Sequence, residues 1–200
     1  RDAVLSLKKE DADDTDSVQS TIVRKEVYQA KIKRRGGIMA LKRLLRKYKA
    51  DLFNKLPKIK LMMLNALKIF EKGPDYQPTD EEGQAAIDSL ELIRSLIGEL
   101  DQSLYPELFD KADLILDALQ SKYSVFRYSA SKCFGSVCAI APGLGFRKLV
   151  RSVLPLLNNA LEVTNRQGAM EAVYHITNLM GASILPYVIF LIVPVMGRMS

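Results

Sequence analysis

A two-helix unit that recurs along the chain constrains its fold more than any other feature of the sequence. In each copy, a helix rich in small residues and leucine is followed by a turn, after which a hydrophobic residue and a proline open a second apolar helix. Proline is tolerated at the first helical position because its missing N–H would have no partner within the helix. The prolines concerned are Pro57, Pro106, Pro155 and Pro186.

The spacing of these units indicates a repeat protein. Successive hydrophobic–proline positions are 49, 49 and 31 residues apart, which brackets the period of about 40–47 residues of HEAT and armadillo repeats. Such helix pairs bury their apolar faces only by stacking on one another. We therefore predict an all-α fold, an α-solenoid of HEAT-type antiparallel helix pairs, with residues 1–200 forming a single array fragment.

Composition supports a packed helical chain. Hydrophobic residues make up 48% of the sequence, which is enough to bury a continuous core and excludes disorder of the whole chain. No sustained alternation of apolar and polar residues predicts strands. Cys133 and Cys138 are five positions apart on a predicted helix, which points them about 140° away from each other. We predict buried, reduced thiols, as expected of an intracellular protein.

Two acidic stretches interrupt the helical pattern. Residues 8–19 have no apolar periodicity and are predicted to form an acidic mobile loop. Residues 71–83 contain two prolines, two glycines and an acidic cluster, which is typical of a long inter-helix loop. Thr79 or Asp80 is a suitable N-cap for the helix that follows.

The most apolar stretch covers residues 182–196. It is shorter than the roughly 18–20 residues that a membrane span requires, and it contains Pro186 and Pro194. We interpret it as a buried core helix and predict no membrane partner. Because nothing downstream in this sequence would cover it well, we expect the chain to be cut from a longer array at its C-terminal end.

No pattern in the sequence predicts catalysis or cofactor binding. The single histidine, His175, has no second histidine or nearby cysteine that could complete a metal site. No phosphate-binding loop is present, and Gly36-Gly37 follows a basic run without a preceding strand. The carboxylates of residues 80–82, Asp110 and Asp113 are better explained as solvated surface. We expect a fragment that is not an enzyme and has no catalytic residue, cofactor or metal.

A basic block is the one feature that favours a binding function. Residues 24–60 contain 14 Lys or Arg and only two acidic residues. If one helix continues through Gly36-Gly37, six of these cations fall within about 60° of arc at 100° per residue. They could contact a phosphate backbone or an acidic protein surface, whereas the alternative is an ordinary solvated face. The six are Arg24, Lys31, Arg35, Lys42, Arg46 and Lys49.

An acidic block follows the basic one. Residues 71–120 contain 13 acidic and 3 basic residues. Alternating blocks reduce repulsion between stacked repeats, so the acidic block is expected to answer the basic block within the rod, although surface pairs are individually weak. The alternative is a contact surface for a basic partner.

Several segments go beyond a generic solenoid. "VFRYSASKCFGSVCAIAP", "RQGAMEAVYHITNLMGASILPYVIFLIVPVMGRMS" and "KIKRRGGIMALKRL" resemble the HEAT-repeat region of the TATA-binding-protein-associated ATPases of the Swi/Snf family (modifier of transcription). The resemblance is close over residues 122–200, looser over residues 32–60 and absent from the acidic N-terminal loop. The closing "YVIFLIVPVMGRMS" is its most specific part.

This resemblance implies a nuclear transcription regulator. In that family the HEAT array grips the TATA-binding protein, and a C-terminal DNA-dependent ATPase, which is helicase-like and binds ATP, removes it from promoter DNA. None of the ATPase motifs has a counterpart here, and no residue-level contact is carried over. The implied role is a non-catalytic scaffold whose partners are the TATA-binding protein and the remaining HEAT repeats and ATPase domain.

Two alternatives remain open at the level of sequence. The basic block 24–60 could contact duplex promoter DNA directly and without sequence preference. A nuclear-transport or scaffold HEAT protein unrelated to transcription would also fit the composition. Salt dependence separates DNA binding from a packed protein interface, because phosphate contacts weaken steeply with salt.

Overall fold

The computed structural model describes residues 25, 28–159 and 161–197. Its contacts divide the chain into two units, residues 1–43 and 44–200, which are described separately. The acidic loop predicted over residues 8–19 lies outside the described residues, as does Arg24. The expectation of a single array over the whole chain therefore stays a prediction.

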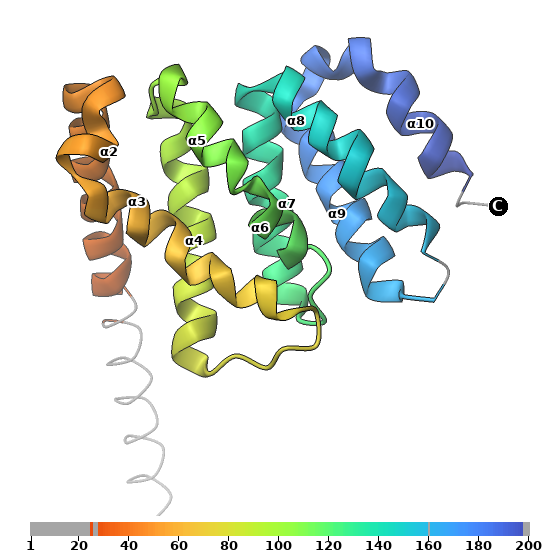
Figure 1. The fold of residues 1–200 in the computed structure, drawn as a ribbon, viewed down its shortest axis with the longest axis horizontal. Coiled ribbons are helices and arrows are strands. Elements are labelled where there is room, and N and C mark those ends of the chain that lie inside the picture. Colours follow the sequence, from red (N-terminus) through yellow and green to blue (C-terminus); the bar gives the residue numbers. More distant parts are fainter. Residues whose placement is uncertain (1–24, 26–27, 160, 198–200) are drawn as a thin grey trace, which may run out of the picture. The chain divides into compact units, whose positions relative to one another are not determined.

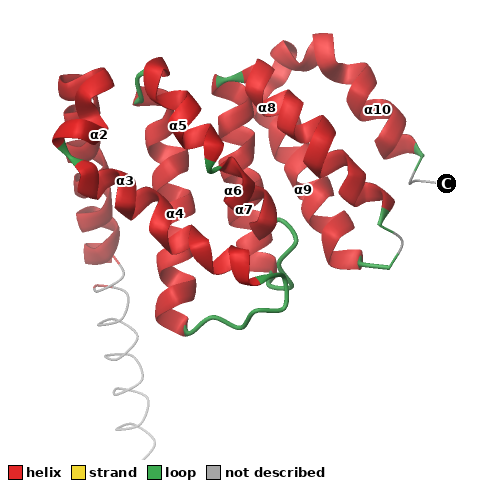
Figure 2. Ribbon diagram, viewed as in Figure 1, coloured by secondary structure: helices red, strands yellow, loops and turns green. Residues whose placement is uncertain are grey.

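Within the described residues the structure consists of helices joined by short loops, with no strand (Figure 2). The all-α prediction is confirmed. Residues 28–48 are helical throughout. The elements that follow are η1 (Lys49–Asp51), α2 (Leu52–Lys55), α3 (Pro57–Leu64), η2 (Asn65–Lys72), α4 (Asp80–Leu96), η3 (Ile97–Glu99), η4 (Gln102–Leu104), α5 (Tyr105–Asp110), α6 (Ala112–Ala118), α7 (Ser124–Ile140), α8 (Pro142–Lys148), the π-helix η5 (Leu149–Val153), η6 (Leu154–Asn158), α9 (Val163–Met180), η7 (Gly181–Tyr187) and α10 (Val188–Met196).

The second unit has two layers of helices (Figure 1). The long helices α4, α7 and α9 lie side by side, with α7 packed between the other two. The shorter helices form the other layer, in which α6 contacts both η2 and α7, and η6 contacts α9. The shorter helices contact long helices that precede them, as α8 contacts α7, and long helices that follow them, as η2 contacts α4. The α-solenoid of HEAT-type pairs stays a prediction.

The core lies between the two layers. Ile93 of α4, Phe134 of α7 and Ile176 of α9 are fully buried. Small residues allow α7 and α9 to approach closely, because a Cβ atom on Gly135 would lie 3.1 Å from the backbone of His175. The buried thiols of Cys133 and Cys138 are free, as predicted. Burial raises the pKa of each thiol to about 12.

The prolines mark helix starts in three of the four predicted places. Pro57 is the first residue of α3, and Pro106 and Pro155 are the second residues of α5 and η6. Pro186 instead lies inside the 3₁₀ helix η7. The second helix of the third pair begins earlier, at Pro142 of α8. A proline after a hydrophobic residue therefore also occurs inside a tightened continuation of a helix, where the missing N–H is tolerated.

The predicted inter-helix loop at 71–83 is shorter in the structure. The helix η2 continues to Lys72, and the non-helical segment covers residues 73–79. Gly73 ends η2 with a φ of 96°, a conformation that favours glycine. Thr79 is the N-cap of α4 and forms a capping box with Glu82, which confirms the predicted helix start.

The interpretation of residues 182–196 as a buried core helix is wrong for this chain. In α10, Leu191 is 4% exposed, but Ile189 is 73% and Val193 is 68% exposed. Leu191 packs against the rest of the second unit, whereas Ile189 and Val193 line an open groove of about 460 Å³ together with Val150 and Leu154. A uniformly apolar sequence gives no sign of which face packs.

By length and composition alone, the helical stretch Val163–Met196 is apolar enough to cross a membrane, with a mean hydropathy of 2.2 over its best window. Gly181 interrupts this stretch with a φ of 50°. The nine residues of α10 span only about 14 Å at 1.5 Å per residue, roughly half the hydrocarbon thickness of a bilayer.

Candidate functional site

The basic helix contains most of the cations that the sequence singles out. Residues 28–48 form one helix without a break at Gly36-Gly37, which meets the condition for a shared face. A Cβ atom at either glycine would have no neighbour within 4 Å, so neither glycine serves a close backbone contact. The geometric basis of the predicted stripe therefore holds over this helix.

Three of the six predicted residues lie on this helix within the first unit. Lys31, Arg35 and Lys42 fall within about 40° of arc at 100° per residue. Lys31 and Arg35 are exposed, whereas Lys42 is half-buried and interacts with another residue. The two exposed cations are available to an anionic partner.

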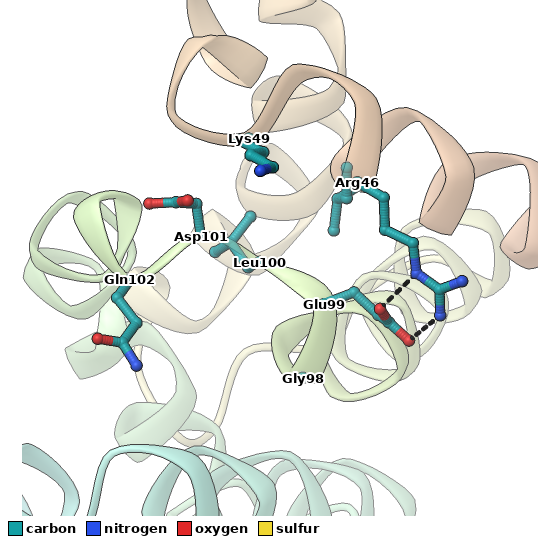
Figure 3. Close-up of a pocket in the computed structure, with 8 residues that line it drawn as sticks. Arg46, Lys49, Gly98, Glu99, Leu100, Asp101 and Gln102 are labelled. Atoms are coloured by element: carbon teal, nitrogen blue, oxygen red, sulfur yellow. Dashed lines mark hydrogen bonds and ion pairs between the residues drawn. The ribbon is translucent and has the colours of Figure 1, made fainter.

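Arg46, in the second unit, is held by an ion pair. Its Nε and Nη2 donate hydrogen bonds of 2.8 Å to the two carboxylate oxygens of Glu99 (Figure 3). This two-point contact is the geometry that best matches a guanidinium to a carboxylate. The hydrogen bond and the charge of Glu99 together raise the pKa of Arg46. The charge of Arg46 is thus paired with that of Glu99 within the chain.

Lys49 does not continue the helical stripe. The α-helical stretch ends at Tyr48, and Lys49 begins the 3₁₀ helix η1 with a φ of 46°. The angular argument therefore stops before this residue. Lys49 lies near Asp101, whose pKa is lowered mainly by hydrogen bonds from Ser103 and further by the charge of Lys49.

Arg46 and Lys49 line a pocket of about 370 Å³ in the second unit (Figure 3). Two cations and two carboxylates face it, so its charges balance and it has no preference for an anion. The lining residues are Leu45, Arg46, Lys49, Gly98, Glu99, Leu100, Asp101 and Gln102.

Ion pairs join the basic block to the acidic block at two places in the second unit. Arg46 pairs with Glu99, and Lys60 pairs with Glu107. Each pair joins residues from successive repeats of the stack. The expectation that the acidic block answers the basic one is confirmed at these positions, while a basic partner for the remaining carboxylates stays a prediction.

His175 lies in an aromatic setting. Its ring makes edge contacts with Tyr128 and Tyr174, at centroid distances of 5.4 and 5.0 Å. Burial lowers the pKa of His175, and the charges of Lys132 and Arg94 lower it further. The described residues contain no group of three His, Cys, Asp or Glu side chains placed to hold a metal.

The sequence does not reveal that one arginine, Arg127, is buried and hydrogen-bonded. Arg127 of α7 is only 6% exposed and donates hydrogen bonds to the backbone oxygens of Ser121 and Lys122 and to the side chain of Gln167 in α9. It ties the loop before α7 to the next long helix. This role is structural, and nothing in the pattern around Arg127 distinguishes it from a surface cation.

Comparison with protein families relates the chain to known proteins. Residues 1–62 match a family described as a domain of unknown function, DUF3535. A TATA-binding protein-associated factor mot1 of Aspergillus fumigatus is 39% identical over 99% of this chain. The Saccharomyces cerevisiae factor MOT1 is 36% identical over 86% of the chain, and the human TATA-binding protein-associated factor 172 is 26% identical over 84%.

The matched region is a small part of each relative. The chain spans 11% of the length of the Aspergillus protein and 9% of the yeast protein. The similarity extends over nearly the whole chain, so the resemblance inferred from its sequence segments is confirmed. It includes the N-terminus, which the family match over residues 1–62 also covers, so the expectation that the resemblance is absent from the acidic N-terminal loop is wrong.

Proposed function

Because the chain is homologous over nearly its whole length to a segment of Mot1-type TATA-binding protein-associated factors, we propose that it is a non-catalytic scaffold of a transcription regulator in the nucleus. In this role the segment positions other parts of its own polypeptide and helps to hold the TATA-binding protein. The observation that carries the proposal is the stack of α4, α7 and α9, in which Ile93, Phe134 and Ile176 are fully buried.

The chemistry of the described side chains supports a structural role. Cys133 and Cys138 are buried thiols with pKa values of about 12, which keeps them protonated and unreactive at neutral pH. The His175 ring makes edge contacts with Tyr128 and Tyr174 rather than with a nucleophilic side chain. ATP turnover, in this proposal, belongs to an ATPase domain elsewhere in the full-length protein.

The exposed apolar surface of α10 supports a place within a longer helical array. Ile189, Phe190 and Val193 are each more than half exposed, a cost that an adjoining repeat would remove by packing on them. Since the relatives are roughly ten times longer than this chain, we propose that further repeats of the same polypeptide cover this face.

A capture experiment tests the proposed partner. The chain is immobilised and incubated with purified TATA-binding protein, with and without promoter DNA, and the retained protein is quantified. We expect retention that does not require DNA, because the proposed contact is between proteins. Absence of retention in both conditions would remove the TATA-binding protein as a partner of this segment.

Direct contact with duplex DNA is a second candidate function. It is favoured by the exposed Lys31 and Arg35 on one face of the basic helix. It is weakened by Arg46, whose charge is engaged by Glu99. Of the predicted stripe, the proposed contact therefore keeps only the part within residues 28–43.

A further inference from the structure

A cationic pocket lies between the shorter helices of two successive repeats. It has a volume of about 240 Å³ and is remote in sequence from the basic block. One wall is formed by residues of α8 and the π-helix η5, and the other is Phe109 of α5. The pocket is lined by Phe109, Leu144, Arg147, Lys148, Arg151 and Ser152.

The backbone of this wall is fixed by the core. Phe146 and Leu149 point inward, and both are almost completely buried. Phe146 also stacks on Tyr187 at a centroid distance of 3.9 Å. The residues on the other face of the same helix are consequently held on a rigid support, a condition for precise recognition.

The π-helix changes which side chains share the pocket. In an α-helix Ser152 would lie about 140° around the axis from Arg147. The wider turn of η5, at Leu149–Val153, lowers the rotation per residue and brings Ser152 closer to the face of the helix that carries Arg147, so that both residues line the pocket. Single π turns are rare and occur frequently at functional sites.

The pocket carries positive charge that its surroundings do not balance. Lys148 donates a 2.6 Å hydrogen bond to Asp113 of α6, so the Lys148 charge is paired with a carboxylate. Among the described residues, neither Arg147 nor Arg151 forms an ion pair or hydrogen bond through its side chain. Two guanidinium groups thus face a preformed cavity together with a hydroxyl donor.

The chemistry of the walls selects the class of ligand. Arginine forks bind carboxylates with paired hydrogen bonds. Phe109 and the partly exposed Leu144 add an apolar surface on which an aliphatic side chain gains by burial. Duplex DNA gains little from these walls, because its backbone presents charge in an open row rather than a single anion beside an apolar group.

We infer that this pocket, lined by Arg147, Arg151, Ser152, Phe109 and Leu144, binds an acidic protein segment that presents a carboxylate next to an aliphatic side chain. The two arginines hold the carboxylate, Ser152 donates an additional hydrogen bond, and the apolar walls receive the neighbouring side chain. This inference is independent of the proposed role with the TATA-binding protein.

Fluorescence anisotropy with the whole chain tests the site. The probe is a short labelled peptide with a Glu-Leu-Glu centre, and its control carries Gln in place of both Glu residues. We expect the Glu peptide to bind and the Arg147→Ala/Arg151→Ala variant to lose at least about tenfold in affinity, given the strength of charge-assisted hydrogen bonds. Leu144→Ser should weaken the same peptide to a smaller extent.

The matched control is Lys55→Ala/Lys58→Ala, which removes two exposed cations elsewhere in the second unit. It should bind the Glu peptide as the parent chain does. Equal weakening by both double variants, equal binding of the Gln peptide, or no binding of the Glu peptide would each overturn the inference. Duplex DNA that competes for the pocket as strongly as the Glu peptide would overturn the assignment to a protein ligand. Unfolding midpoints verify that every variant is folded.

Discussion

At the scale of single residues, the tightest constraint is at Gly168 of α9, where the helix crosses the end of the α6 segment. A Cβ atom at this position would collide with the backbone oxygen of Leu119. Backbone atoms cannot rotate away as a side chain can, so the helix itself would have to shift. Gly168→Ala is therefore expected to destabilise the chain by about 1–3 kcal/mol, as overpacked cores do.

Chemical denaturation of Gly168→Ala measures this cost. Gly143→Ala is the matched control, since Gly143 of α8 is exposed and a Cβ atom there meets nothing within 4 Å. The control should unfold at the parent concentration or slightly above it, because alanine favours helix over glycine. Unchanged stability of the Gly168 variant would show that α9 accommodates the methyl group by moving.

A half-buried carboxylate provides a test through pH. Burial raises the pKa of Asp117 in α6, and the charges of Asp113 and Glu71 raise it further. The folded state therefore holds this proton more tightly than the unfolded state, so ionised Asp117 costs stability above its folded pKa. Asp117→Asn should be more stable than the parent chain at pH 7.

The stability gain of Asp117→Asn should shrink as the pH falls below about 4, where Asp117 is protonated in both the folded and the unfolded chain. Urea midpoints of the parent chain and the variant, measured at pH 7 and below pH 4, give the stability gain at each pH. The contributions of the other carboxylates are the same in both proteins and cancel in the comparison. A gain that is the same at both values would assign the effect to hydrogen bonding or helix propensity instead.

At the scale of secondary-structure elements, the long helices are predictable from the sequence because each carries a local signal. The Thr79 capping box starts α4, and the small residues and apolar stripe of α7 and α9 give their period. The shorter helices are less predictable, because η5, η6 and η7 arise where tertiary packing tightens or widens a helix. The cationic pocket depends on η5, so no spacing rule in the sequence could have found it.

Charge pairing is also beyond the reach of local pattern. The angular argument groups Lys31, Arg35 and Lys42 correctly on one helix. It could not reveal that Arg46 meets Glu99, 53 positions later, since that contact depends on how successive repeats stack. For the same reason Arg127 resembles a surface cation in sequence and is buried in the structure.

The basic helix is testable as an element. If Lys31, Arg35 and Lys42 contact phosphates, the salt dependence of duplex binding should have a slope near −0.9 per contact. Replacing all three by Ser should lower the affinity and flatten the slope, without altering sequence preference, because phosphate contacts do not read bases. Titrations of labelled duplexes at several salt concentrations provide both quantities.

A charge-matched variant separates a phosphate contact from the effect of net charge. Lys58→Ser/Lys68→Ser/Lys111→Ser removes three exposed cations from elsewhere in the chain. It should retain more affinity and a steeper slope than the variant of the basic helix. Identical behaviour of the two triple variants would show that the basic helix is an ordinary solvated face.

At the scale of the whole molecule, stacking that builds the second unit also determines which surfaces are left uncovered. The helix α7 packs between α4 and α9, which buries residues of all three helices, whereas the apolar side chains of α10 along its groove with η5 and η6 stay largely exposed. Composition could predict that residues 182–196 are apolar enough for a core. It could not predict which of them the 200-residue chain covers, because that depends on an adjacent packing partner.

The uncovered face of α10 should govern how the isolated chain behaves in solution. Ile189 and Val193 are 73% and 68% exposed and sit one turn apart beside the exposed Phe190. Contiguous apolar surface of this kind promotes association. We expect the chain to self-associate with rising concentration and Ile189→Glu/Val193→Glu to shift it toward monomer, as measured by sedimentation velocity. The melting temperature should not fall, because neither side chain is buried.

Leu191→Glu, at a position that is only 4% exposed, should instead destabilise the chain, since it places a charge in the packed face of the same helix. A double variant that melts as early as Leu191→Glu would mean that Ile189 and Val193 already pack within this chain.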